Sequence, residues 1–109
     1  MESDYAKQGK TAAIIAYITI FGTLIAFFMN HDRKNQFASF HIRQALGLWI
    51  MFYLLVALAE IFNSIFVHIG FWFFSIVLII YGLILASREE QKTVPIVGPY
   101  FQEWFNFIK

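Results

Sequence analysis

Two apolar stretches decide the fold of this chain: TAAIIAYITIFGTLIAFFM at residues 11–29, and ALGLWIMFYLLVALAEIFNSIFVHIGFWFFSIVLIIYGLILA at residues 45–86. A bilayer core about 30 Å thick offers the backbone no hydrogen-bond partner, so apolar runs of roughly 20 residues are typical of helices that cross it. The first run is long for the core of a cleaved signal peptide, and no small-residue cleavage site follows Met29. We therefore expect a permanent membrane helix at 11–29.

The composition of the chain also indicates a membrane protein. Of its 109 residues, 60% are hydrophobic and only 14% are charged, which is too apolar for an ordinary soluble domain. The charged residues collect at 1–10, 30–44 and 87–93 instead of alternating with apolar ones, so these segments are expected to be aqueous. A formal net charge of +1 and the lack of a basic stripe argue against nucleic-acid binding. The absence of cysteine excludes disulfides and thiolate chemistry.

The sequence predicts an all-α integral membrane protein that forms a single domain over residues 1–109. The first apolar run has small or weakly polar residues at alternating steps of four and three, which places them on one face suited to packing against other helices: Ala12, Ala16, Thr19, Thr23 and Ala26. A polar turn around Asn63 divides the second apolar region into two helices. Three crossing helices are therefore expected, at residues 11–29, 42–66 and 70–87.

The C-terminal segment has a different pattern. Pro99 can start a helix, and from there apolar and aromatic side chains share one face while Gln102 and Glu103 lie on the other. This pattern predicts an amphipathic helix at 98–108 that lies in the membrane interface. A fourth crossing is the alternative, although ten residues after Pro99 reach only about 15 Å.

Basic residues indicate the orientation of membrane helices. Arg33, Lys34 and Arg43 fall between the first two predicted helices, and Arg88 and Lys92 follow the third, whereas the turn between the second and third helices has no basic residue. The loop at 30–44 and the C-terminus are therefore expected to face the cytoplasm. Three crossings would then place the N-terminus outside, which conflicts with the pair Lys7 and Lys10.

Glu60 is the only acidic residue within an apolar run, and ionisable groups inside a membrane are candidates for function. It shares a helix face with Tyr53, Ala57 and Ser64, so these residues could form a polar seam that carries a proton or a cation. The alternative is that Glu60 lies solvated at the end of a helix. The three histidines are too dispersed to form a metal site, and neither a metal nor a cofactor is expected.

The segment FHIRQA at residues 40–45 places a histidine, an arginine and an amide at the expected start of a membrane helix. Arg43 can reach headgroup phosphates, and Gln44 can hydrogen-bond to a neighbouring helix or loop. The alternative is an interfacial anchor with no specific partner. No nucleophile or second acid–base group accompanies His41, so the sequence predicts no enzymatic activity.

Residues 37–46, with the short charged loop before them, the two apolar helices after them and Val94–Gly98, resemble a widespread family of small bacterial membrane proteins. That family is related to the membrane-embedded import-channel subunit of the chloroplast inner-envelope translocon. The resemblance covers about residues 13–105, and its most specific residues are Phe40, His41, Gln44 and Ala45, supported by Pro95 and Gly98.

The resemblance implies a helical protein of the bacterial inner membrane with a role in protein translocation or membrane assembly. The first helix lacks the proline that often breaks it in the family, which argues against a kinked or re-entrant first helix.

These features together predict a non-enzymatic scaffold or accessory subunit of a membrane assembly, without a cofactor. Its expected partners are the lipid bilayer and either further copies of the chain or a larger membrane protein, because three short helices leave small-residue faces uncovered. The alternative function is a small ion or solute transport protein that uses Glu60 in the polar seam with Tyr53 and Ser64.

Overall fold

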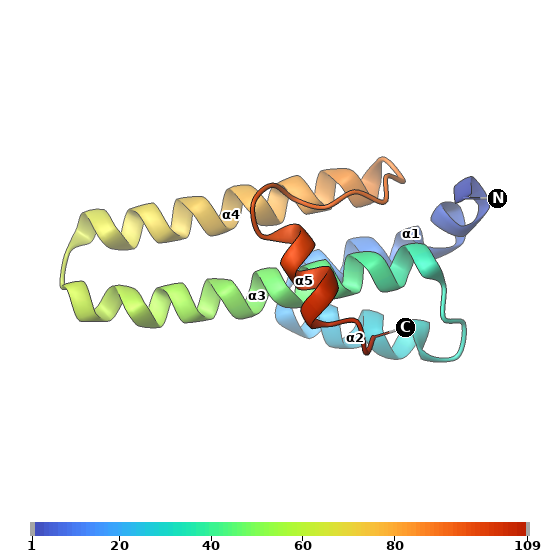
Figure 1. Cartoon of the computed structure of the whole chain (residues 1–109), viewed down its shortest axis with the longest axis horizontal. Coiled ribbons are helices and arrows are strands. Elements are labelled where there is room, and N and C mark those ends of the chain that lie inside the picture. The colour runs from blue at the N-terminus through green and yellow to red at the C-terminus, as the bar shows by residue number, and fades with distance from the viewer. Residues whose placement is uncertain (1, 109) are drawn as a thin grey trace.

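The computed structural model describes residues 2–108, and every regular element in that range is a helix, which confirms the all-α class. The helices are α1 (Glu2–Ile18), α2 (Ile20–His31), α3 (Gln36–Phe62), α4 (Ile65–Ser87) and α5 (Gly98–Trp104). Helices α3 and α4 form a long antiparallel hairpin (Figure 1), and the shorter α1 and α2 pack beside one end of it. The short α5 lies across α3 at that same end.

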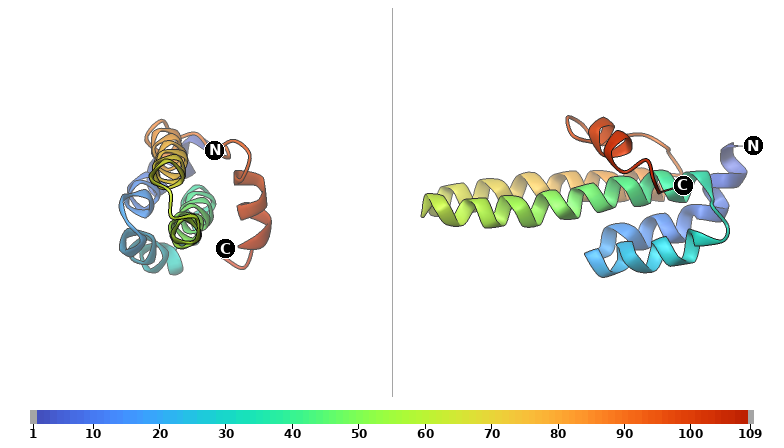
Figure 2. Two further views of the ribbon diagram at one scale, coloured as in Figure 1. Left: turned by 90° about the vertical axis from the view of Figure 1, so that its left-hand side faces the viewer. Right: turned by 60° about the horizontal axis from the view of Figure 1, so that its bottom comes forward.

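The prediction of one continuous helix at 11–29 is wrong, because the chain reverses direction at Thr19. The backbone of Thr19 is extended (φ −154°, ψ 172°), and its hydroxyl oxygen caps α2 by accepting a hydrogen bond from the Gly22 N–H at 3.0 Å. The Thr23 hydroxyl donates to the Ala16 carbonyl at 2.7 Å, which satisfies a group left without a helical partner at the end of α1. Helices α1 and α2 therefore form a hairpin (Figure 2).

Gly22 permits the tight reversal between α1 and α2. A Cβ atom at this position would lie 2.1 Å from the carbonyl oxygen of Ile15 and would push the two helices apart. The predicted packing face is nevertheless used, because Ala12, Ala16, Thr23 and Ala26 are buried while Thr19 is exposed at the tip. The small residues thus serve the contacts of a hairpin and not those of a crossing helix.

Two of the described helices are long and apolar enough to cross a membrane, not three as predicted. They are α3 and α4, and both begin several residues before the predicted starts at 42 and 70. The N-cap Asn35 explains the early start of α3, since its side-chain oxygen accepts from the Ala38 N–H at 2.9 Å. Asn63, in the left-handed conformation with φ 47°, ends α3 at the turn.

The core lies at one end of the α3–α4 hairpin. The buried residues of α3 cluster between Phe37 and Leu48, and those of α4 between Ser75 and Ala86. Gly82 marks the close approach of α1, because a Cβ there would lie 2.5 Å from the Tyr17 ring. Toward the Asn63 turn, α3 and α4 extend beyond the other helices (Figure 1).

Helix α5 ends at Trp104 and is shorter than the predicted helix at 98–108. Phe101 points its ring at Gly47 of α3, where a Cβ would lie 2.2 Å from the ring. Phe101 and Ile108 are buried, whereas Tyr100 and Trp104 are exposed, so the predicted apolar face is divided between the protein and its surroundings. Seven residues span only about 10 Å, which is too short for a fourth crossing.

Candidate functional site

The FHIRQA segment contributes two side chains to a buried polar cluster, which we call the polar hub: Tyr17, His41, Gln44 and the backbone of residues 90–94. The Tyr17 hydroxyl lies 2.6 Å from His41 Nδ1 and 2.9 Å from Gln44 Nε2. His41 Nε2 lies 2.8 Å from the Glu90 carbonyl, and Gln44 Oε1 accepts from the Val94 N–H at 2.8 Å. The hub therefore joins α1, α3 and the segment that follows α4.

The hydrogen bonds of the hub have one consistent direction. The Glu90 carbonyl can only accept, so His41 Nε2 must carry a proton, and in the neutral ring Nδ1 accepts from the Tyr17 hydroxyl. The Tyr17 oxygen in turn accepts from Gln44 Nε2, because Gln44 Oε1 is occupied by Val94. Each polar group of these three side chains has a partner within the chain, as burial in an apolar surrounding requires.

The Pro95–Gly98 element packs directly against this hub. Gly98 is required there, because a Cβ would lie 2.6 Å from the Thr93 side chain and 3.0 Å from Gln44 Oε1. A three-residue turn precedes it, in which the Val97 N–H donates to the Pro95 carbonyl at 2.8 Å and Ile96 has a φ of 71°. This φ is strained for a β-branched residue. The two motif segments, 50 residues apart, thus form one site, although Pro95 itself is exposed.

Arg43 does not extend toward headgroups as predicted, because it holds the C-terminal segment. Its Nε donates to Gln102 Oε1 at 2.7 Å, and its Nη1 donates to the Ile108 carbonyl at 2.6 Å. Gln102 Nε2 completes this link by donating to the Phe40 carbonyl at 2.9 Å. Ala45 is fully buried, so three of the four residues of the Phe-His-x-x-Gln-Ala pattern are buried, and Phe40 is half-buried.

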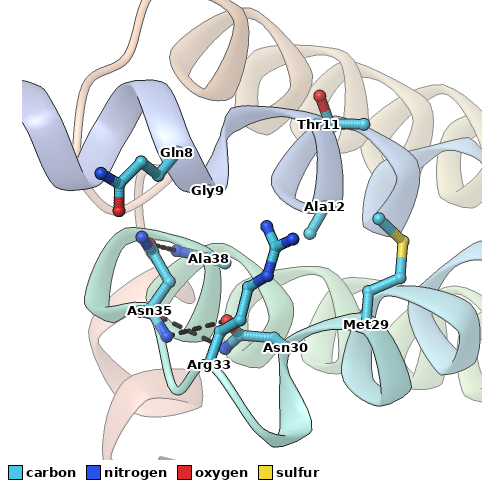
Figure 3. A pocket seen from close by; sticks show the side chains of 9 residues that line it. All are labelled: Gln8, Gly9, Thr11, Ala12, Met29, Asn30, Arg33, Asn35 and Ala38. Carbon is cyan, nitrogen blue, oxygen red and sulfur yellow. Dashed lines mark hydrogen bonds between the residues drawn. The ribbon is translucent and has the colours of Figure 1, made fainter.

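A second polar cluster fixes the loop between α2 and α3. Asn30 Nδ2 donates to Ser39 Oγ at 2.8 Å, and Asn30 Oδ1 accepts from the Asn35 N–H at 2.8 Å. Figure 3 shows Asn30 and Asn35 at the edge of an open pocket of about 360 Å³ between α1, α2 and α3, with Arg33 extending across it. A neighbouring pocket is lined by Gln8, Arg33, Lys34 and Asn35, so two basic side chains lie beside this cluster.

The predicted polar seam is not enclosed. Tyr53 and Glu60 are exposed on the distal part of α3, and Ser64 lies in the turn that follows. Since Tyr53 and Glu60 are exposed, no buried path connects these residues. Within residues 2–108, no three His, Cys, Asp or Glu side chains come together as metal ligands.

Tyr17 was not identified from the sequence as a member of the hub, and Thr19 was assigned to the packing face and not to a helix cap. The available indication for Tyr17 was a phenol within an apolar run, since a buried tyrosine hydroxyl needs a hydrogen-bond partner. The indication for Thr19 was its position three residues before Gly22, which is the spacing of a helix cap.

A model of the magnetosome magnetite crystal formation protein family matches residues 8–101. The chain belongs to this family. No curated protein and no solved structure matches the chain. The matched range begins in α1 and ends in α5, so it includes the whole polar hub and the Pro95–Gly98 element.

Membership in the magnetosome magnetite crystal formation protein family supports the coarse prediction of a small bacterial membrane protein. The finer prediction, a likeness to the chloroplast import subunit, receives no support from the match. The family match and the two long apolar helices together indicate contact with lipid.

Proposed function

We propose that the chain is a non-enzymatic accessory subunit of a magnetosome membrane, inserted from one side and acting as a scaffold for other components. The observation that carries the proposal is the distribution of charge. The basic side chains described in the structure lie at the end where the α1–α2 hairpin opens, as the contact between Lys10 and Glu89 and the neighbouring Arg33 and Lys34 illustrate. Glu60 is the charged residue near the opposite end.

Insertion from one side would remove the conflict over the N-terminus. With a re-entrant hairpin and two crossings, the N-terminus, the loop at 32–35 and the C-terminal segment all lie on one side, so Lys7 and Lys10 join the other basic residues. Basic residues favour the cytoplasmic side of a bacterial inner membrane. We place this end in the cytoplasm and the Asn63 turn on the opposite face.

A scaffold role suits the way in which the motif residues are used. His41, Gln44 and Arg43 donate to or accept from their own chain, which stabilises the fold and leaves their polar groups occupied. Catalysis would need a free acid–base or nucleophilic group directed at a substrate. The residues of the FHIRQA segment therefore stabilise the fold and leave no free group for a reaction.

The surface proposed to receive a partner is the outer face of α5. Tyr100 and Trp104 are exposed there, and Trp104 also lines an apolar groove between α3 and α5. Aromatic side chains are enriched at protein interfaces and at membrane interfaces. The partner is either a second copy or a larger membrane protein. No structural observation favours the import role or transport through Glu60, so neither is proposed.

Crosslinking in native membranes tests this proposal. A bifunctional maleimide on Glu103→Cys, which is exposed on α5, should capture a second copy or a larger membrane protein, while Asp32→Cys, which is exposed in the loop between α2 and α3, should not. The native chain has no thiol that would interfere. Monomers alone, both after crosslinking and in blue-native electrophoresis, would contradict the scaffold role.

A further inference from the structure

The molecule is wide at one end and narrow at the other. The tip of the α1–α2 hairpin reaches the level of Trp49, whose indole N–H donates to the Ala16 carbonyl at 3.3 Å. Leu55 is the last residue of α3 that lines the groove with α5. Seven residues follow it up to Phe62, and over this length of about 10 Å α3 and α4 extend beyond the other helices (Figure 1). Figure 2 shows α1, α2 and α5 gathered around one half of the α3–α4 hairpin.

The outer face of the α1–α2 hairpin is suited to contact with lipid. Phe21 and Phe28 on α2 are each 71% exposed, and Leu24 and Ile25 between them are exposed as well. Such a face belongs in hydrocarbon, not in water. The 12 residues of α2 extend about 18 Å, a little more than half of a bilayer core, so the hairpin occupies one leaflet.

We propose that the chain acts as a wedge that favours a membrane curved convexly toward its wide, basic end. Segments of five helices displace lipid in or near one leaflet and only α3 and α4 do so in the other, so the area taken from the two leaflets is unequal. The convex leaflet of a curved membrane has more headgroup area per lipid, so it accommodates the extra helices at a lower free-energy cost. This inference rests on the one-sided insertion given under Proposed function.

Orientation in vesicles of different size tests the wedge. The full chain with Gln91→Cys at the wide end, or with Ser64→Cys at the narrow end, is reconstituted from detergent into small sonicated vesicles and large extruded vesicles. An impermeant maleimide then labels the outward thiols, and the total is measured after detergent. The ratio of outward to inward Gln91→Cys thiols should be severalfold higher in small vesicles than in large ones. The same ratio for Ser64→Cys should change in the opposite direction.

Two matched variants control for a general effect of vesicle size. Phe21→Ala with Phe28→Ala trims the wide end, and Phe66→Ala with Phe73→Ala trims equally exposed rings at the narrow end (82% and 71%). The first pair should reduce the orientation bias, and the second should preserve or increase it. The same outward fraction in both vesicle sizes, or an equal loss of bias in both pairs, would overturn the wedge.

The two proposals can fail separately. If Lys7→Cys and Gln91→Cys are labelled from opposite sides, the one-sided insertion is wrong. If they are labelled from the same side but their orientation ignores vesicle size, the insertion stands and only the wedge is refuted.

Discussion

The two halves of the α3–α4 hairpin have similar apolar sequences but very different surroundings. In the half that begins at Phe37, Ala45 and Leu48 are fully buried against α1, α4 and the C-terminal segment. In the other half, Leu54 and Ile61 are exposed, and a few contacts such as the Phe52–Trp72 ring pair at 4.8 Å hold the helices together. Since lipid is as apolar as leucine, hydrophobicity alone does not determine this difference. The polar hub and close contacts at glycine define the packed half.

The largest effect is expected from removing the amide of the hub. In Gln44→Leu the side chain keeps its size, but the buried Val94 N–H loses its acceptor and Tyr17 loses a donor. We expect a loss of about 3 kcal/mol in the free energy of unfolding. Denaturation in mixed micelles, followed by circular dichroism, measures it.

The matched change in the other half is Leu54→Gln, which introduces the same amide at an exposed position of α3. It should leave the contacts of the hub intact. A Gln44→Leu variant as stable as the parent chain would show that the hub does not define the packed half.

A smaller effect is expected from filling the space at Gly82. In Gly82→Ala the new methyl group would lie 2.5 Å from the Tyr17 ring, so α1 and α4 must separate. We expect destabilisation of about 2 kcal/mol. Gly70→Ala in the distal half is the control, because a Cβ there meets nothing within 4 Å, and it should be neutral or stabilising. Equal thermal stability of the two variants would show that the close contact at Gly82 does not stabilise the packed half.

Tyr17→Phe removes a single hydroxyl from the hub. His41 Nδ1 then loses its donor, while Gln44 Nε2 keeps a longer contact of 3.4 Å with the Lys92 carbonyl. We expect a loss of about 1.5 kcal/mol. The control is Tyr81→Phe on the exposed side of α4, which should not change the unfolding midpoint. A similar result for both tyrosines would mean that the hydroxyl of Tyr17 contributes nothing.

The smallest effect is expected at Glu60. This carboxylate is exposed near the turn and forms no buried path with Tyr53 or Ser64. Glu60→Gln should therefore leave both the free energy of unfolding and the ion flux in liposomes unchanged. The flux assay compares the variant with the parent chain under a proton or cation gradient. A clear change in flux would support the transport hypothesis and show that the half of the α3–α4 hairpin near the Asn63 turn has its own function.

The sequence predicted the features that depend on local pattern. The helical class, the approximate positions of α3 and α4 and the buried face of Ala12, Ala16 and Ala26 follow from hydropathy and spacing. The motif residues Phe40 to Ala45 were also identified, although their role was not. These features are visible because each depends on residues within a few helical turns.

The features that were missed depend on a short local signal or on distant contacts. An apolar run of 19 residues suits either a crossing helix or a hairpin, and the choice depends on the Thr19 cap and on Gly22, which permits the close approach to Ile15. The pairing of Gln44 with Val94 spans 50 residues, so no periodicity could reveal it. The number of helices long and apolar enough to cross a membrane was therefore mispredicted.

The side of the membrane on which the N-terminus lies tests whether the α1–α2 hairpin is re-entrant. Lys7→Cys, Gln91→Cys and Ser64→Cys are expressed singly in the native host, and intact spheroplasts are treated with an impermeant maleimide. A re-entrant hairpin predicts that Lys7→Cys and Gln91→Cys share one accessibility and that Ser64→Cys has the opposite one. If Lys7→Cys instead shares the accessibility of Ser64→Cys, the first apolar run crosses the membrane and the account is wrong.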